Sequence, residues 1–217
     1  MRYYPICLDL QNRPVLVVGG GLIAEGKALQ LVEAQANVHV VSPTLTETLR
    51  QKVAQGIITY RQGEFTATDL DGKVLIVSAT NIQAVNEAVA QAANARGLLC
   101  NVVDQPALCN FITPTIVTRG DLQIAISSSG KSPTVALRIK REISKLIGEE
   151  YQTLLEITAE LRAEFRQVTP DYNTRRDFLK SFVDSEALEL IRAGKVEETK
   201  ILASKMLADF VKNMPNK

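Results

Sequence analysis

The sequence predicts an α/β fold for the first half of the chain and helices for the rest, and three observations favour this division. Short apolar runs alternate with amphipathic stretches up to residue 103, as is typical of buried parallel strands that alternate with helices. A run of glycines follows the first apolar run. After residue 149 only helical patterns occur. Because crossovers between parallel strands are right-handed, we expect a doubly wound, Rossmann-type sheet in the first half.

Elements of the first half are expected from apolar periodicity and from the residues that stop each run. The strands are expected at 15–18, 37–42, 57–60, 74–78 and 98–103. The helices are expected at 22–35, 45–55 and 82–96. Pro43 ends the second strand, and Gly56 and Gly97 end the second and third helices.

The pattern changes after Pro106. Two strands, 111–117 and 122–127, are expected to form a hairpin because no helix separates them. Ser132 as N-cap and Pro133 in the first turn begin a helix that runs to about residue 147. Further helices are expected at 151–168, 174–182, 185–193 and 195–212. The predicted domains are a nucleotide-binding part at 1–112, a small α+β module at 113–148 and an all-helical part at 149–217.

Composition indicates a globular protein with no bias toward nucleic acid or membranes. The chain has 217 residues, of which 46% are hydrophobic and 23% charged, and its net charge is +1. So small a charge gives no field that would attract a polyanion, and no apolar run is long enough to span a bilayer. The start of the chain lacks the apolar run of a secretory signal, so we expect a cytoplasmic protein.

The cysteine and histidine content argues against a metal site. Cys7, Cys100 and Cys109 fit no metal or redox spacing, and their odd number favours reduced thiols. Cys7 and Cys100 lie in apolar, strand-like runs, so both are expected to be buried. His39, the single histidine, also lies in an apolar run and is expected to be structural.

A nucleotide site is predicted at the glycine-rich turn, Gly19-x-Gly21-x-x-Ala24, because it joins a buried strand to a helix. In such a turn the first glycine permits a tight bend, the second lets the backbone approach a pyrophosphate, and the small third residue lets the helix pack on its strand. The amides and dipole of the helix N-terminus attract the anion. The alternative is a turn that binds no nucleotide. Three consecutive glycines argue against it, because glycines are costly to fold unless the backbone must be free of side chains.

Small and polar residues at two strand ends are further candidates for cofactor contacts. They are Ser42, Pro43 and Thr44 at the end of the second strand, and Ala79, Thr80 and Asn81 after the fourth. The first group stands where this fold often has an acidic residue for the adenine ribose. Neither that carboxylate nor an arginine for a 2′-phosphate is present, and we expect NAD. The alternatives are that Ser42 and Pro43 only end their strand, and that Thr80 or Asn81 caps the next helix.

A carboxylate and a basic helix face are the remaining candidates. Asp104 follows the fifth strand at the same edge of the sheet, where it can accept a proton or simply cap a turn. Residues 127–133 form a polar loop before a helix on which Arg138, Arg141 and Lys145 share one face. Such a face can grip carboxylates or be an ordinary solvated surface.

Several segments in the same order resemble the precorrin-2 dehydrogenase family, the N-terminal module of siroheme synthases. They are Tyr4-Pro5-Ile6, residues 17–24, Val40-Val-Ser-Pro43, Ala79-Thr80, Asn101-Val-Val-Asp104-x-Pro106, Phe111-Ile-x-Pro-x-Ile116 and Ile126-Ser-Ser-Ser-Gly-x-Ser-Pro133. The match covers residues 1–150, and the segments at 101–104 and 128–133 are the most specific. The helical tail is also of the kind that this family carries.

The resemblance implies that a homodimer, joined through its central module, oxidises precorrin-2 to sirohydrochlorin with NAD. Asp104 matches the functional aspartate of the family, and Leu22 and Ile23 match residues whose amides meet the pyrophosphate. Candidates for substrate contacts are Ser128, Ser129, Gly130, Lys131, Ser132, Arg138 and Arg141. Fused relatives carry a phosphoserine in this serine-rich loop, in which Ser128 lies. Some members also insert ferrous iron into sirohydrochlorin and others do not, and no residue here separates the two.

The sequence departs from the family pattern in two places. Gly26-Lys27 replaces an Arg-Lys pair, which removes a positive charge near the phosphates. A glycine inside a helix also costs about 1 kcal/mol relative to alanine. Gln105 and Cys109-Asn110 replace the more usual acidic and small-serine neighbours of the active loop.

Two other functions stay open on the sequence. One is a redox-sensing regulatory protein with a Rossmann domain and a helical dimerisation tail. It would need a basic recognition element, but acidic residues are interspersed among the basic ones of residues 174–212. The other is a scaffold that has lost catalysis, against which Asp104 and the glycine turn weigh.

Overall fold

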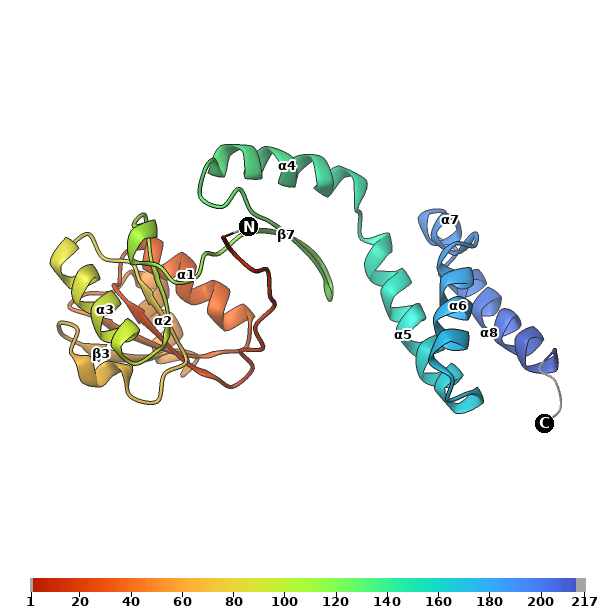
Figure 1. The fold of residues 1–217 in the computed structure, drawn as a ribbon, viewed down its shortest axis with the longest axis horizontal. Coiled ribbons are helices and arrows are strands. Elements are labelled where there is room, and N and C mark those ends of the chain that lie inside the picture. The colour runs from red at the N-terminus through yellow and green to blue at the C-terminus, as the bar shows by residue number, and fades with distance from the viewer. Residues whose placement is uncertain (1, 214–217) are drawn as a thin grey trace. The chain divides into compact units, whose positions relative to one another are not determined.

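The computed structural model describes residues 2–213 of the chain. The chain separates into two compact units, Met1–Thr113 and Pro114–Lys217 (Figure 1). The finer, three-part division expected from the sequence stays a prediction.

In the described residues, the first unit contains a five-stranded parallel sheet. Its strands are β1 (Pro14–Val18), β2 (Asn37–Ser42), β3 (Thr59–Gln62), β4 (Leu75–Ser78) and β5 (Leu99–Val102). Their order is β3-β2-β1-β4-β5 and each neighbouring pair is parallel. The chain therefore winds outward in both directions from β1, and the predicted doubly wound sheet is confirmed.

Helices cover both faces of this sheet (Figure 1). On one face, α1 (Leu22–Glu33) and α2 (Glu47–Ala54) bury Ala24, Ala28 and Leu49 against β1 and β2. On the other face, α3 (Gln83–Ala95) and the 3-10 helix η1 (Ala67–Leu70) pack Val89, Ala93 and Leu70 on the apolar strands. The continuous apolar runs in the sequence thus reflect strands that are buried on both sides.

The third strand was predicted two residues too early. It begins at Thr59 rather than at Ile57, because the residues before Thr59 are hydrogen-bonded to the C-terminus of α2. Gly56 adopts φ +72°, and the amides of Ile57 and Ile58 both donate to the carbonyl of Lys52. The chain therefore joins the sheet only after this cap is complete. The second helix likewise begins late, at Glu47, because the hydroxyl of Thr46 accepts the amide of Leu49.

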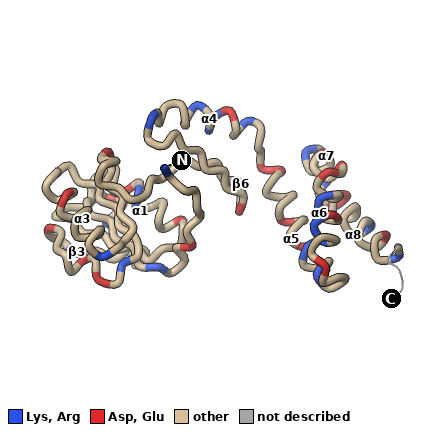
Figure 2. Tube along the Cα trace, in the orientation of Figure 1, with Lys and Arg blue, Asp and Glu red and all other residues tan. Residues whose placement is uncertain are grey.

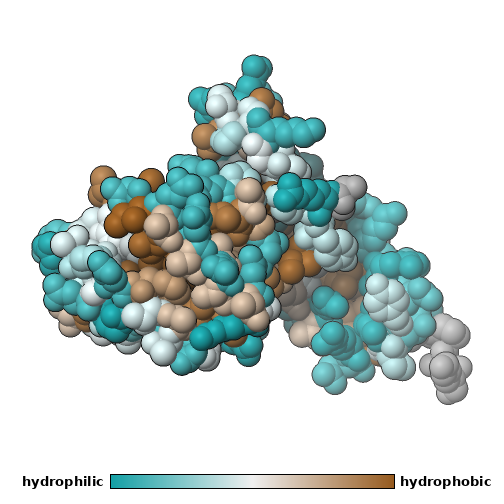
Figure 3. Space-filling model, turned by 60° about the vertical axis from the view of Figure 1, so that its left-hand side comes forward, coloured by the Kyte–Doolittle hydropathy of each residue, from teal (hydrophilic) through white to brown (hydrophobic). Residues whose placement is uncertain are grey.

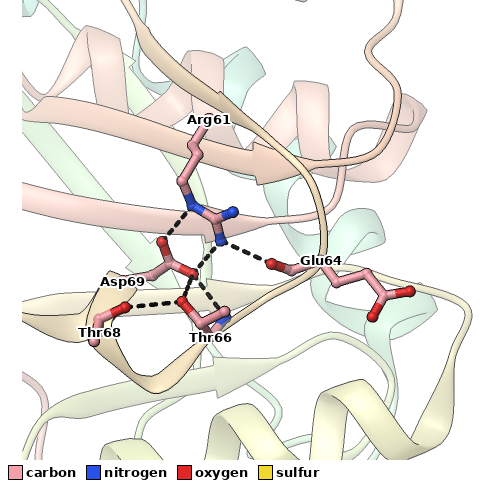
Figure 4. Close-up of polar contacts among 5 residues, drawn as sticks. All are labelled: Arg61, Glu64, Thr66, Thr68 and Asp69. Carbon is pink, nitrogen blue, oxygen red and sulfur yellow. Dashed lines mark hydrogen bonds and ion pairs between the residues drawn. The ribbon is translucent and has the colours of Figure 1, made fainter.

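An ion pair closes the edge of the sheet beyond β3 (Figure 4). The Arg61 guanidinium donates to both carboxylate oxygens of Asp69, and it also donates to the Glu64 carbonyl at 2.7 Å. Asp69 accepts further bonds from the amide and hydroxyl of Thr66, which completes a capping box at the start of η1. Burial would raise the pKa of Asp69, but the bonds from Arg61 and Thr66 outweigh burial and lower this pKa below 3.8.

Replacing Asp69 by asparagine is expected to lower the free energy of unfolding by about 2 kcal/mol at neutral pH, since Arg61 would lose a charged acceptor. Because the folded-state pKa of Asp69 is depressed, its contribution is present above pH 3.8 and is lost as the pH falls through the folded-state pKa. Urea unfolding at neutral and strongly acidic pH checks this. Asp71→Asn is the control, because its ion pair with Arg96 is exposed and should contribute less than about 1 kcal/mol. A deficit in Asp69→Asn that does not shrink in acid would contradict the assignment.

The second unit begins with an antiparallel hairpin, β6 (Thr115–Arg119) and β7 (Leu122–Ile126), followed by α4 (Pro133–Leu146). The Ser132 hydroxyl accepts the amide of Val135, so the predicted N-cap is confirmed. The prediction that the first of these strands begins at Phe111 is wrong. Phe111 packs against the core of the first unit, and its carbonyl accepts the side-chain amide of Asn101.

The rest of the described chain is helical. The helices are α5 (Glu150–Val168), α6 (Tyr172–Val183), α7 (Ala187–Arg192) and α8 (Val196–Lys212). Their core contains Phe165, whose ring stacks on Phe178 with 4.2 Å between centroids. α6 starts two residues earlier than expected because Asp171 accepts the amide of Thr174. Across residues 2–213, we find no helix with the length and apolar character that a membrane crossing requires.

Candidate functional site at the carboxyl edge of the sheet

The carboxyl ends of the parallel strands place the cofactor candidates and Asp104 on one edge of the first unit. Backbone bonds join the segments that follow the strands. Gly19 donates to Val41 at 2.9 Å, Ala79 donates to Val18 at 2.8 Å, and Val103 donates to Ser78 at 2.9 Å. In an open α/β sheet this edge forms the crevice in which ligands bind.

The three glycines of the turn have different surroundings. A Cβ on Gly19, which has φ +120°, would lie 2.5 Å from the carbonyl oxygen of Ala79. A Cβ on Gly20 would lie 1.9 Å from the carbonyl oxygen of Thr44. A Cβ on Gly21 would have no atom within 4 Å. The protein's own packing therefore requires the first two glycines, whereas Gly21 faces open space of the kind that an approaching pyrophosphate would need.

The start of α1 offers unpaired donors beside this open space. Gly21 is the N-cap and no side chain caps the helix. The amides of Leu22, Ile23 and Ala24 lie in the first turn, where an α-helix has no backbone acceptor for them. Leu22 is 79% exposed and Ile23 is 56% exposed, so water or a ligand can reach this end. In the view of Figure 3, apolar residues (brown) lie at the surface among hydrophilic ones (teal). These donors fit a pyrophosphate group.

The ribose candidates after β2 are fixed by their neighbours. Ser42 is buried, and its carbonyl accepts the hydroxyl of Tyr60 at 2.8 Å. The carbonyl of Pro43 accepts the side-chain amide of Gln62 at 3.2 Å. Arg61 lies opposite Val41 in the strand register, but its guanidinium forms an ion pair with Asp69. That arginine is therefore not free to bind a 2′-phosphate, which favours NAD over NADP.

The segment after β4 is held by a buried asparagine that the sequence did not single out. Asn86 accepts the Ser78 hydroxyl at 2.7 Å and donates to the Thr80 carbonyl at 3.1 Å. The alternative that Thr80 or Asn81 caps the next helix is wrong. The N-cap of α3 is Ile82, and the hydroxyl of Thr80 instead accepts the Ile82 amide within the preceding turn.

Asp104 is exposed and occupies a four-residue turn, in which the amide of Gln105 donates to the carbonyl of Val102. Its φ is +60°, a conformation that aspartate and asparagine tolerate better than most residues. Among the described residues, no hydrogen bond or ion pair engages the Asp104 carboxylate. The alternative that this side chain caps backbone amides therefore finds no support, and the carboxylate is free to act on a ligand.

One cysteine of the first unit differs from expectation. Cys7 is exposed rather than buried, because the residues before β1 form no strand; Cys100 is buried as predicted. Lys27, in α1, donates to the hydroxyl of Thr113 at 3.1 Å, and burial lowers the pKa of its amine.

Within residues 2–213, no three His, Cys, Asp or Glu side chains lie close enough together to bind a metal ion.

The substrate candidates lie in the second unit, in the loop that leads into α4. The hydroxyl of Ser128 accepts the Ser132 amide at 3.1 Å, so both residues help to fold this loop. Ser129 and Gly130 have positive φ values of 54° and 80°, and the amide of Lys131 donates back to Ser128. The loop is thus a tight turn in which Lys131 and the Ser129 side chain are exposed.

The basic face of α4 is exposed. Figure 2 shows basic positions along this helix together with an acidic one. Arg138 pairs with Glu142 at 3.0 Å, but both side chains remain more than half exposed, so this pair does not withhold Arg138 from a ligand. Arg141 is exposed as well. The structure therefore leaves both arginines accessible without showing what they bind.

Comparison with protein families gives three matches in chain order. Residues 6–115 match the family described as "Putative NAD(P)-binding". Residues 119–146 match the central region of sirohaem biosynthesis proteins, and residues 150–207 match the sirohaem synthase dimerisation region.

Curated relatives include siroheme synthases. That of Photobacterium profundum is 36% identical over 200 residues, which are 92% of this chain and 43% of the relative. That of Methylobacillus flagellatus is 38% identical over 208 residues, which are 96% of this chain and 44% of the relative. The chain thus spans less than half the length of these relatives.

A solved structure is similar to this chain over most of its length. It is SirC, a precorrin-2 dehydrogenase, with a TM-score of 0.78 and 28% sequence identity. The similarity covers 94% of this chain and all of that one. The match over half of the chain, together with the open glycine turn at the carboxyl edge of its sheet, shows that the chain belongs to this NAD(P)-binding family.

Proposed function

We propose that this chain oxidises precorrin-2 to sirohydrochlorin with NAD. The observation that carries the proposal is one sheet edge with two features. It holds an open anion site, at Gly21 and the uncapped start of α1, and the Asp104 carboxylate, which nothing in residues 2–213 pairs with. The likeness to a precorrin-2 dehydrogenase over nearly the full chain supports the choice of substrate.

The oxidation removes two hydrogen atoms from the substrate, as one hydride and one proton. A bound NAD would supply the hydride acceptor. We assign the proton to the carboxylate of Asp104, whose exposed position lets it pass the proton to solvent. The products are sirohydrochlorin, NADH and H⁺. The protein's contribution is to hold the reacting groups in place.

Substrate binding is assigned to the basic and hydroxyl groups of the second unit. Precorrin-2 carries eight carboxylates, and Lys131, Arg138 and Arg141 are exposed cations on one loop and helix. The match to a dimerisation region at residues 150–207 supports a homodimer. A cytoplasmic location stays a prediction from the sequence.

Insertion of ferrous iron is the second candidate activity, with iron as a substrate. It is favoured by the relatives' name, siroheme synthase, and by the chemistry of Asp104. Metal insertion releases two pyrrolic protons, and an unpaired carboxylate beside the substrate could accept them.

The test is an anaerobic incubation of the protein with enzymatically made precorrin-2 and either NAD or NADP, followed by absorbance. We expect the sirohydrochlorin spectrum, with NAD preferred. Ferrous iron added afterwards tests the second activity, which predicts sirohaem formation above the rate without protein. Binding of NAD with no oxidation would reject the dehydrogenase and favour a redox-sensing regulator.

A further inference from the structure

The segment that follows Asp104 turns back along β5. This strand lies at the end of the sheet order, and the returning residues cover it within the part of the chain that the structure describes. Asn110 donates its amide to the Cys100 carbonyl at 3.1 Å, and its side-chain oxygen accepts the Cys100 amide at 2.8 Å. These two bonds hold Asn110 against β5, so the chain that leaves the Asp104 turn returns to the strand that leads into it.

The thiol of Cys109 is the part of this anchor that contacts the Asp104 turn. Its Sγ accepts the amide of Val102 at 3.1 Å. The same Sγ lies 3.2 Å from the Val102 carbonyl oxygen and 3.3 Å from the Gln105 carbonyl oxygen, either of which can accept the thiol proton. Val102 and Gln105 are the first and last residues of the four-residue turn around Asp104. One half-buried thiol thus contacts both ends of that turn.

Backbone geometry sets the direction of the Cα–Cβ bond of Asp104. In the described residues no polar group holds its carboxylate, and φ +60° is maintained by the turn itself. A group that fixes Val102 and Gln105 therefore fixes the point from which the Asp104 side chain extends.

We propose that Cys109 is a positioning residue, which aims the Asp104 carboxylate at the substrate by holding both ends of its turn. This inference rests on the proposed function, because it assumes that Asp104 accepts the proton. The thiol acts through hydrogen bonds alone and undergoes no redox change.

Kinetics of Cys109→Ala and Cys109→Ser test the proposal. The alanine variant should lower kcat for precorrin-2 oxidation roughly 10- to 100-fold, since small misplacements of a reacting group have effects of that size. KM for NAD should stay unchanged, because the glycine turn is not touched. Serine keeps a donor and an acceptor at this position and should recover most of kcat. Cys7→Ala is the control, since Cys7 is exposed and belongs to no strand.

A double-mutant cycle separates positioning from a general structural effect. If Cys109 acts through Asp104, then Cys109→Ala should cause no further loss in an Asp104→Asn background. Multiplied losses in the double variant, or a kcat of Cys109→Ala equal to that of the natural protein, would overturn the proposal. So would a serine variant no better than alanine.

Amide hydrogen exchange gives a measurement that needs no turnover. The Val102 amide should exchange several-fold faster in Cys109→Ala than in the natural protein, while the Val41 amide in β2 should not change. If the natural protein oxidises no precorrin-2, the proposed function fails, and the exchange rates still decide whether the thiol holds the turn. Equal exchange at Val102 in both proteins would overturn the inference even if the natural protein is an active dehydrogenase.

Discussion

Replacement of Asp104 by asparagine is expected to lower kcat for precorrin-2 oxidation by about 100- to 10,000-fold, the usual range for loss of a general base. The fold should not change, because asparagine has the same shape and is well tolerated at φ +60°. Within residues 2–213, the Asp104 carboxylate also forms no hydrogen bond that the substitution would remove. Steady-state kinetics and thermal unfolding of the same preparation measure the two effects.

The matched control is Asp121→Asn. Asp121 is also an exposed aspartate in a turn, between β6 and β7, and no part of the proposed chemistry uses it. We expect its kcat to equal that of the natural protein. Full turnover by Asp104→Asn would reject Asp104 as the base. A large drop in its melting temperature would instead show that the carboxylate stabilises the fold.

The second large effect is expected when either of two neighbouring glycines is replaced by alanine: one replacement should weaken NAD binding and the other should lower stability. Gly21→Ala should fold normally, because a methyl group there meets open space, but it should raise Kd for NAD at least about tenfold by intruding where the pyrophosphate approaches. Gly20→Ala should lose about 3 kcal/mol of folding free energy or fail to fold, because its methyl group would overlap the Thr44 carbonyl.

Isothermal titration with NAD and urea unfolding check this pair. The expected pattern is weak binding with normal stability for Gly21→Ala, and low stability for Gly20→Ala. Normal NAD affinity in Gly21→Ala would show that the cofactor does not pass over this glycine. Normal stability in Gly20→Ala would show that the loop after β2 can move away.

Most of the fold followed from the sequence because its signals are local. Continuous apolar runs identified β1 and β4, and Ser132 with Pro133 identified the start of α4. The predicted ends of elements were less accurate where the residues of a helix cap also look like the start of a strand. Ile57 is apolar and β-branched, but the C-terminal cap of α2 holds its amide, so β3 starts later.

The site was predictable only in part, because some roles depend on contacts between distant segments. The spacing of the glycines pointed to the turn, but it could not show that Gly20, at a variable position of the pattern, faces the Thr44 carbonyl. Nor could it show that Asn86 holds the segment after β4, or that Cys109 contacts both ends of the Asp104 turn. Cys7 was misplaced because an apolar run resembles a strand even where no partner strand is present.

The central claim is that the carboxyl edge of this sheet transfers a hydride from precorrin-2 to NAD. The most direct measurement is the ratio of NADH to sirohydrochlorin formed in one anaerobic reaction of the natural protein. The account predicts one NADH for each sirohydrochlorin, and formation of both products about 100- to 10,000-fold more slowly with Asp104→Asn. Sirohydrochlorin formed without NADH, or NAD bound without either product, would contradict it.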